Sequence, residues 1–393
     1  MKQKLLVISI LLVALMTACA PTQSANTLPV LSTTATPVAA SNAVQQVEYS
    51  PVVAVNSAVL ATVQSTFQQI YQNVNPSVVN IQVTENLGYA SSSGEGSGFV
   101  WDNQGHIVTN NHVVENASSI SVTFADGTVA DAKLVGTDPE SDLAVIQVDV
   151  NAAKLRPVTL ADSQAVQVGD LVIAIGNPYG LSGTMTQGIV SALSRSLTVD
   201  QSTPYSTGSY TIPDIIQTDA AINPGNSGGV LVDVAGRVVG VTAAIQSSSG
   251  SNSGIGFVIP AKIVQRVVPV LIKDGSYAHP RLGISGTALT PSLTQQVGLD
   301  ANLQGILVVA VSANSPADKA GLQASTQQRS RNGQTAIVAA GDVITAIDGQ
   351  AVKSFDDLTS YLFNNTAVGQ TVQLTILRNG VEQMVAVTLE AGS

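Results

Sequence analysis

Short stretches of alternating apolar and polar residues constrain the fold of this chain more than any other feature. They follow one another from residue 77 onward, as in Ile120–Phe124, where every second residue is apolar. Turn residues separate them, among them the tight pair Asp126-Gly127. Many short strands at such spacing are typical of β-barrels and sandwiches. We therefore predict a mostly β protein with two successive units, barrels or sandwiches, over residues 77–162 and 163–273.

The segments around these two units differ in composition. Residues 19–57 consist mainly of Ala, Ser, Thr, Pro, Gln and Val with almost no charge, which is typical of an unstructured tether. Residues 58–76 place apolar side chains at helical spacing and end at a proline, which predicts an N-terminal helix. Residues 280–391 combine short strands with a helix from Phe355, so we predict a third domain there.

Residues 1–18 have the features of an export signal. Two lysines precede a run from Leu5 to Met16 that is apolar except for Ser9 and is too short to span a bilayer permanently. Cys19, the one cysteine of the chain, then stands where bacterial lipoprotein signals are cut and lipidated, and the segment resembles such a signal. Met16 occupies a position where leucine is usual, so an ordinary secretory signal is the alternative. Both interpretations place the mature chain outside the cytoplasm.

Composition restricts the partners of the mature chain. Apolar residues make up 45% of the sequence and charged residues 11%, which is ample material for globular cores. Removal of the two lysines with the signal changes the net charge from −10 to −12. An acidic chain without clusters of Lys and Arg is not expected to bind nucleic acid, because neutralisation of phosphates drives that binding.

Ser227 is the candidate nucleophile. It lies in the string NPGNSGG, residues 223–229, where glycines surround it in a predicted turn. Such a turn exposes the serine hydroxyl and leaves backbone N–H groups free to stabilise an oxyanion, as acyl transfer requires. The string alone is also compatible with an ordinary glycine-rich turn.

A serine nucleophile needs an imidazole base and a carboxylate that orients it. His112 follows a predicted strand, and Asp142 precedes another, where a buried acid needs a partner such as protonated His112. His106 lies inside a strand and is expected to be structural, whereas His279 in the last linker is expected to be a solvated surface residue. The order His, Asp, Ser is that of chymotrypsin-type proteases, whose site lies between two barrels.

Six strings in order resemble the HtrA/DegP family, trypsin-like proteases of bacterial envelopes with C-terminal PDZ domains. They are TNNHVV at 109–114, SDLAVI at 141–146, AIGNP at 174–178, QGIVSALSRS at 187–196, QTDAAINPGNSGG at 217–229 and GIGFVIP at 254–260. The resemblance implies two six-stranded chymotrypsin-like barrels followed by one PDZ domain. It also implies Ser227 as nucleophile, His112 as general base and acid, Asp142 as the orienting acid, and the N–H groups of Gly225 and Ser227 as oxyanion hole.

The same resemblance suggests where specificity resides. Ala221, Ile222 and Ile245 would lie near the primary specificity pocket and favour cleavage after small or medium aliphatic residues. Asp219 at the start of that loop is the alternative, and it would favour basic residues instead.

The third domain resembles a PDZ domain, a small β-barrel with helices. One string matches the loop that holds the C-terminal carboxylate of a bound peptide. The residues of this loop are Arg281, Leu282, Gly283 and Ile284. An insertion over residues 323–340 separates two strings that nearly touch in most relatives. It is either a tolerated surface loop or a contact to the protease or the substrate.

Together these features predict a serine endopeptidase of the cell envelope that cleaves unfolded or misfolded proteins without a cofactor or metal. A chaperone-like holder or a peptide-binding scaffold with little proteolysis is the alternative. Relatives assemble as trimers through the segment before the first barrel, where Phe67 and Tyr71 either make that contact or pack on their own barrel. Residues 197–210 and 246–253, rich in Ser, Thr and Gly, are predicted to be mobile loops near the site.

Overall fold

The computed structural model of the chain describes residues 57–86, 91–178, 183–203, 206–245, 254–329 and 335–392. The predicted export signal, Cys19 and the predicted tether precede these residues and lie outside them. Within the described part of the chain, the helices are too short or too polar to cross a bilayer.

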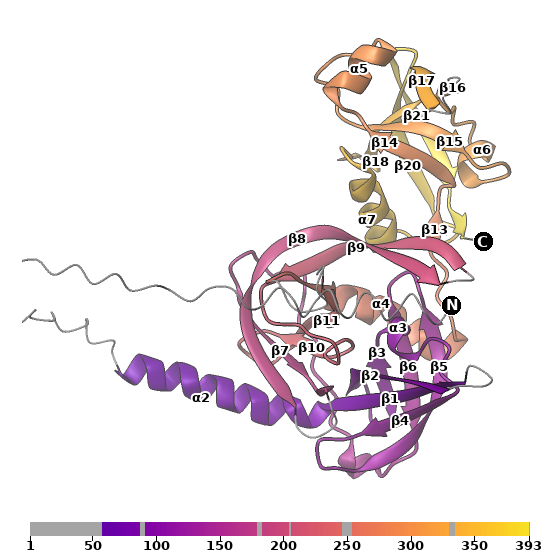
Figure 1. Cartoon of the computed structure of the whole chain (residues 1–393). Helices are drawn as coiled ribbons and strands as arrows, with labels where there is room; N and C mark the ends of the chain where they lie inside the picture. The colour runs from indigo at the N-terminus through magenta and orange to yellow at the C-terminus, as the bar shows by residue number, and fades with distance from the viewer. Residues whose placement is uncertain are drawn as a thin grey trace, which may run out of the picture. The chain divides into compact units, whose positions relative to one another are not determined.

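Six antiparallel strands close the first barrel (Figure 1). Around the barrel they follow the order β1-β2-β3-β6-β5-β4. The strands are β1 Val78–Asn86, β2 Ser91–Val100, β3 His106–Thr109, β4 Ser119–Thr123, β5 Val129–Asp138 and β6 Leu143–Val148. Alternate β-branched side chains such as Ile81, Ile107 and Ile146 fill its interior and are fully buried. Burial of these side chains stabilises the barrel because it removes apolar surface from water.

The second barrel is also closed, in the order β10-β11-β12-β9-β8-β7. Its strands are β7 Leu171–Gly176, β8 Thr184–Thr203, β9 Ser206–Thr218, β10 Val230–Val232, β11 Val238–Ile245 and β12 Gly256–Pro260. Val190, Ile216 and Leu231 are among the buried side chains of its core. Strand pairing thus repeats the architecture of the first barrel with strands of very different length.

Of residues 197–210, predicted to be a mobile loop, the described residues 197–203 and 206–210 form strand instead. β8 and β9 stay paired as far as Thr203 opposite Ser206, so the two strands make one long hairpin. A two-stranded ribbon is held by main-chain hydrogen bonds and needs no buried face, which explains why no apolar alternation marks it. The other predicted loop, 246–253, lies outside the described residues.

A shared core joins the two barrels. Phe99 of the first barrel belongs to the same buried cluster as Ile173 and Val230 of the second. Helix α4 (Ala261–Asp274) buries its apolar stripe in this cluster and ends at Gly275, whose φ of 79° suits a left-handed helix cap. This shared core therefore fixes the position of the residues at the edge of one barrel relative to the other barrel.

Helix α2 (Ser57–Val74) precedes the first barrel, to which the short turn η1 (Asn75–Ser77) connects it. Near its C-terminal end, Ile70 and Val74 are buried in the shared core. Toward its N-terminal end, Val59 and Leu60 are each 56% exposed. Figure 1 accordingly shows the indigo helix running out from the barrels, so only its last turns contribute to the core.

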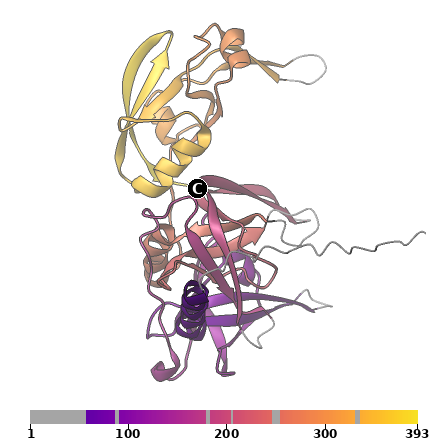
Figure 2. The same ribbon diagram turned by 90° about the vertical axis from the view of Figure 1, so that its left-hand side faces the viewer.

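The third domain is a small sheet with helices (Figure 2). The sheet order is β14-β15-β18-β20-β21, while β19 pairs with β18 and β13 pairs with β22. The strands are β13 Pro280–Arg281, β14 Ile284–Ala288, β15 Ile306–Val311, β18 Val343–Ile347, β19 Gln350–Ala351, β20 Thr371–Arg378, β21 Val381–Thr388 and β22 Glu390–Ala391, and the helices are α5 Pro291–Val297, α6 Pro316–Lys319 and α7 Phe355–Asn365. A reciprocal capping box between Ser354 and Asp357 starts α7. Two closed six-stranded barrels followed by this domain confirm the predicted fold class.

The insertion over residues 323–340 folds onto its own domain. It contains a two-stranded hairpin of β16 (Thr326–Arg329) and β17 (Thr335–Ala339). Gln327 Nε2 donates to the carbonyl of Val309 at 2.9 Å. At the base of the insertion, buried Asp342 receives two hydrogen bonds of 2.7 Å from Arg378 and one of 2.8 Å from the N–H of Gln323. These bonds attach the hairpin to the sheet.

Candidate active site

Two glycines shape the loop that carries Ser227. Gly225 and Gly228 have φ angles of 91° and 84°, in the left-handed region that glycine adopts without strain. At Gly228 a Cβ atom would lie 2.1 Å from the carbonyl oxygen of Ser97 in β2. The loop of the second barrel therefore approaches the first barrel closely, and Ser227 lies at their junction.

Ser97 holds this loop at two points, and the sequence analysis did not single it out. Its N–H donates to the carbonyl of Ser227 at 2.7 Å, and its Oγ donates to the carbonyl of Gly225 at 2.6 Å. The sequence does contain a signal for a close contact at Ser97, because glycine occupies every second position from 94 to 98. At Gly96 a Cβ would lie 3.3 Å from the carbonyl oxygen of Ser227, so these glycines let the strand meet the loop.

The hydroxyl of Ser227 is bonded to the backbone and not to the candidate base. Ser227 Oγ donates to the carbonyl of Ala243 in β11 at 3.0 Å. Among the hydrogen bonds of the described residues, none joins Ser227 to His112. Hydrogen bonds of catalytic groups often form or tighten only with substrate bound. In this resting geometry the hydroxyl has to leave the Ala243 carbonyl before it can give its proton to an imidazole.

His112 and Asp142 form the predicted pair. Helix α3 (Asn111–Val114), one turn that follows β3, carries His112, while Asp142 directly precedes β6. His112 Nδ1 lies 2.8 Å from Asp142 Oδ2, and the backbone N–H of His112 donates to Asp142 Oδ1 at 3.0 Å. The side chain of Asp142 is 3% exposed and that of His112 is 42% exposed. A buried carboxylate thus orients an accessible imidazole and leaves Nε2 free for the serine.

The pKa of His112 is raised above its ordinary value of 6.5. Burial acts in the other direction, because it disfavours the charged imidazolium and lowers the pKa. The hydrogen bond and the negative charge of Asp142, with a contribution from the charge of Glu115, outweigh burial. The imidazole is therefore a stronger base than that of an unperturbed histidine.

The backbone of Asp142 adopts a conformation that is uncommon outside glycine, with a φ of 53°. Its N–H donates to the carbonyl of Pro139 at 3.2 Å. Its carbonyl accepts from the N–H of Asn111 at 3.1 Å and from Asn110 Nδ2 at 2.9 Å. These three bonds hold the turn that points the carboxylate at His112.

Two backbone N–H groups beside the nucleophile have no hydrogen-bond acceptor. In the part of the chain that the structure describes, neither Gly225 nor Ser227 donates a backbone hydrogen bond. Buried N–H groups are normally paired, so unpaired ones next to a serine hydroxyl are available to a ligand oxygen. An oxyanion formed at Ser227 would provide that acceptor.

The residues expected near the specificity pocket differ in exposure. Ile222 is 1% exposed and belongs to the core of the second barrel, while Ala221 is half-buried. The side chain of Ile245 lies outside what the structure describes. Asp219, the alternative recognition residue, is exposed, and its Oδ1 accepts from the N–H of Ile189 at 2.7 Å. Its carboxylate is thus bound to the backbone of β8.

The carboxylate loop expected in the third domain borders a groove of about 760 Å³. The groove is lined by Arg281, Leu282, Gly283 and Ile284 of the loop and by Phe355 and Leu358 of α7, among others. Among the described residues, no backbone acceptor is recorded for the N–H groups of Leu282 and Gly283. The groove has the size of pockets that hold ligands, and its loop offers N–H donors to a carboxylate.

The other two histidines are both buried beside a carboxylate. His106, expected to be structural, is 6% exposed, and its Nδ1 lies 2.7 Å from Asp102 Oδ2. His279 was expected to be a solvated surface residue, but it is 5% exposed and its Nε2 lies 2.8 Å from Asp138 Oδ2. That prediction was wrong, because the linker pairs with the end of β5 instead of running into solvent.

The described residues contain no cluster of three or more His, Cys, Asp or Glu side chains that could hold a metal ion. Each histidine is instead engaged by one aspartate, and the three aspartates are Asp102, Asp142 and Asp138. The histidines of the described residues are therefore distributed over separate histidine–aspartate contacts and do not converge on one point.

Two family models match the chain. That of the trypsin-like peptidase domain matches residues 96–241, and that of the PDZ domain matches residues 280–389. The first match contains His112, Asp142 and Ser227. The second contains the carboxylate loop and the groove.

Known proteins and solved structures resemble the chain over most of its length. It is 42% identical over 339 residues to the chloroplastic Protease Do-like 1 of Arabidopsis thaliana, covering 84% of this chain and 72% of that protein. It is 42% identical over 300 residues to the periplasmic serine endoprotease DegP of Salmonella typhimurium, covering 76% of this chain and 57% of DegP. A structure of the HtrA-type protease AlgW with a tripeptide matches with a TM-score of 0.66 at 36% identity, covering 83% of this chain and 97% of that one. The chain thus spans little more than half the length of DegP.

Proposed function

Because this chain belongs to the HtrA/DegP family of trypsin-like serine endoproteases with a C-terminal PDZ domain, we propose that it cleaves unfolded or misfolded proteins through an acyl-enzyme on Ser227. The observation that carries this proposal is the bonding of His112 to Asp142 by both its backbone N–H and its Nδ1. This bonding fixes the tautomer in which Nε2 can accept a proton, at the junction where the serine loop meets the first barrel.

The proposed reaction has two steps, formation and hydrolysis of the acyl-enzyme, and each group of the site acts once in each step. Ser227 Oγ leaves the Ala243 carbonyl, gives its proton to His112 Nε2 and attacks the scissile carbonyl carbon. The resulting oxyanion accepts hydrogen bonds from the N–H groups of Gly225 and Ser227, while Asp142 stabilises the imidazolium. The departing amine takes the proton from His112 and leaves the acyl-enzyme. Water then attacks in the same way and releases the acid.

The test of this function is to label the purified enzyme with a fluorophosphonate and to map its cuts in an unfolded protein by mass spectrometry. We expect the label on Ser227 and cuts after small or medium aliphatic residues, since Ala221 and Ile222 are apolar and Asp219 is bound to β8. A label on another residue would exclude Ser227 as nucleophile. Cuts mainly after Lys or Arg would overturn only the proposed preference and favour Asp219.

Proteolysis should decline on acidification with an apparent pKa above 6.5, because only the neutral imidazole of His112 accepts the serine proton. Asp142 raises the pKa of His112, so protonation sets in at a higher pH than for an unperturbed histidine. The measurement is kcat/KM from about pH 5 to about pH 9, with thermal unfolding recorded at each pH to exclude loss of fold. Full activity well below pH 6.5 would contradict His112 as base.

We propose that the PDZ groove takes the C-terminal end of a peptide as an added strand. The free N–H groups of Leu282 and Gly283 and the apolar wall of α7 support this assignment. A peptide with a free C-terminus should therefore bind more tightly than the same peptide amidated at that end. Equal affinities would speak against recognition of the carboxylate.

We propose that the enzyme acts as a homotrimer that associates through α2. Phe67 packs on the shared core and Tyr71 Oη donates to the carbonyl of Gly183 at 2.8 Å, so both expected contact residues face their own barrel. Val59 and Leu60 are open to a neighbouring copy. Light scattering should give three times the chain mass for residues 57–392 and the mass of one chain after removal of 57–74. A single-chain mass for both would contradict the proposal.

We propose that the enzyme works outside the cytoplasm, held to a membrane by a lipid on Cys19. The support is the export signal of residues 1–18 and the position of the one cysteine directly after it. The matched relatives carry periplasmic and chloroplastic names. The mass of the processed N-terminal peptide tests the proposal, since cleavage without an added lipid would leave an ordinary secreted enzyme.

A further inference from the structure

The linker between α4 and the PDZ domain returns to the first barrel. The N–H of Thr137, near the end of β5, donates to the carbonyl of Gly275 at 3.1 Å, and Thr137 also pairs with Ser276. His279 follows three residues later, beside Asp138. The linker therefore runs along the strand end from which the turn 138–142 begins, and this turn ends at Asp142.

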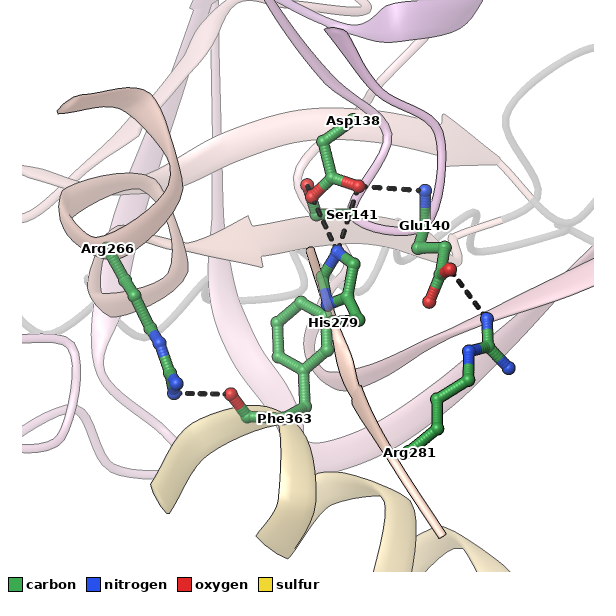
Figure 3. A network of polar contacts seen from close by, with 7 residues as sticks. All are labelled: Asp138, Glu140, Ser141, Arg266, His279, Arg281 and Phe363. Carbon is green, nitrogen blue, oxygen red and sulfur yellow. Dashed lines mark hydrogen bonds and ion pairs between the residues drawn. The ribbon is translucent and has the colours of Figure 1, made fainter. Parts of the chain in front are cut away.

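His279 and Asp138 form a buried pair (Figure 3). His279 Nε2 lies 2.9 and 2.8 Å from the two carboxylate oxygens, and the two side chains are 5% and 2% exposed. The ring of His279 stacks on Phe363 of α7 with 4.8 Å between ring centroids, and Tyr277 meets it edge-on. His279 Nδ1 has no hydrogen-bond partner. Asp138 is thus the polar contact of this imidazole, and the aromatic rings limit where the imidazole can move.

Asp138 in turn organises the turn that ends at Asp142. Its Oδ2 accepts from Ser141 Oγ at 2.5 Å, and its Oδ1 accepts from the N–H of Glu140 at 3.2 Å. Asp142 follows directly with its left-handed φ of 53°. A residue in such a conformation keeps it only when surrounding contacts hold it there. The carboxylate of Asp138 supplies two of these contacts, one residue and two residues before Asp142.

A second contact reaches the same turn from the surface. Arg281, which follows His279 by two residues, lies 2.5 Å from Glu140 Oε1 (Figure 3). Both side chains are more than a third exposed, so water and salt weaken this pair far more than the buried one. The buried pair of His279 and Asp138 therefore restrains the turn more strongly than the pair of Arg281 and Glu140 does.

We propose that His279 is a positioning residue for proteolysis, which fixes the turn that aims Asp142 at His112 by holding Asp138 and, through it, Ser141. His279 lines the PDZ groove, and its polar contact is Asp138, so it acts on the reaction only through that carboxylate. The inference rests on the proposed roles of His112 and Asp142. Because the ring also stacks on Phe363, a PDZ residue contacts the side chain that supports the catalytic carboxylate.

His279→Ala should lower kcat by about 10- to 100-fold and leave KM within about twofold, as expected when a catalytic group is displaced by about 1 Å without loss of the binding surface. The acid limb of the pH profile, which is the decline of kcat/KM on acidification, should also move to lower pH. The reason is that a displaced Asp142 raises the pKa of His112 less than a correctly placed one does. His279→Gln should recover most of both properties, since its amide N–H can donate to Asp138. The substrate is a short peptide amidated at its C-terminus, which does not depend on capture of a carboxylate by the PDZ groove.

His106→Ala is the matched control. It removes another buried histidine, whose Nδ1 lies 2.7 Å from Asp102. Asp102 belongs to the first barrel, as Asp138 does. We expect it to lower the melting temperature while kcat per fluorophosphonate-reactive enzyme and the acid limb stay at wild-type values. Equal losses in both variants would show that His279 merely stabilises the barrel.

Asp142→Asn separates this inference from the proposed function. If Asp142→Asn keeps full activity, the proposed role of Asp142 fails. If it loses activity while His279→Ala keeps the wild-type kcat and acid limb, only the positioning role is overturned. Should His279→Ala not fold, His279→Asn decides, because its shorter amide keeps a polar group but does not reach Asp138 as Nε2 does. A wild-type acid limb in His279→Asn overturns the proposal.

Discussion

Ser227→Ala should reduce kcat for cleavage of an unfolded protein by about 10⁶-fold, the size of effect seen when a triad serine is removed from such enzymes. Alanine lacks the Oγ that forms the acyl-enzyme but keeps the backbone groups through which Ser97 holds the loop. The single hydrogen bond lost, from Oγ to the Ala243 carbonyl, contributes about 1 kcal/mol to the free energy of unfolding. The variant should therefore fold normally and bind substrate.

Cleavage by Ser227→Ala is measured over days beside thermal unfolding and fluorophosphonate labelling. Ser119→Ala, which removes an exposed hydroxyl from β4, serves as the matched control and should keep full activity and labelling. Residual cleavage at more than about a thousandth of the wild-type rate, in a preparation free of other proteases, would mean that Ser227 is not the nucleophile.

The barrels could be predicted because each strand buries one face. Ile120 and Val122 alternate with polar residues, and both are buried in the first barrel. The same rule fails for the outer part of the β8–β9 hairpin, where the strands are paired although the sequence shows no apolar alternation. The closing of each sheet into a barrel also has no local signal. For that step the prediction depended on the order of the six strings that resemble a known family.

The part of the site that could be predicted is the part marked by short sequence strings. The glycines around Ser227 and the strings that contain His112 and Asp142 identified the three side chains. The contacts that hold them were not predictable, because they join segments far apart in the chain. Ser97 lies 128 residues before Gly225, and Asp138 lies 141 residues before His279. The resting bond of Ser227 to Ala243 depends on a rotamer, which no sequence pattern specifies.

Asp142→Asn should lower kcat near neutral pH by about 10⁴-fold without loss of fold. The backbone N–H of His112 requires an acceptor at the position of Oδ1, 3.0 Å away, so the amide oxygen of asparagine will take that place. Its NH₂ group then faces His112 Nδ1, which lies 2.8 Å from the other carboxylate oxygen. Two donors cannot share this contact, and the imidazole has to carry its proton on Nε2 instead. In that tautomer it cannot accept the proton of Ser227.

The pH dependence of Asp142→Asn distinguishes this explanation from a general loss of structure. The bond and charge of Asp142 raise the pKa of His112, so their removal should shift the acid limb of the residual activity to lower pH. Asp102→Asn, which changes the carboxylate beside His106 in the same barrel, should leave kcat and the acid limb unchanged. Wild-type kcat in Asp142→Asn would remove Asp142 from the mechanism. A large loss of kcat with an unshifted acid limb would mean that Asp142 supports the site without acting on the protonation of His112.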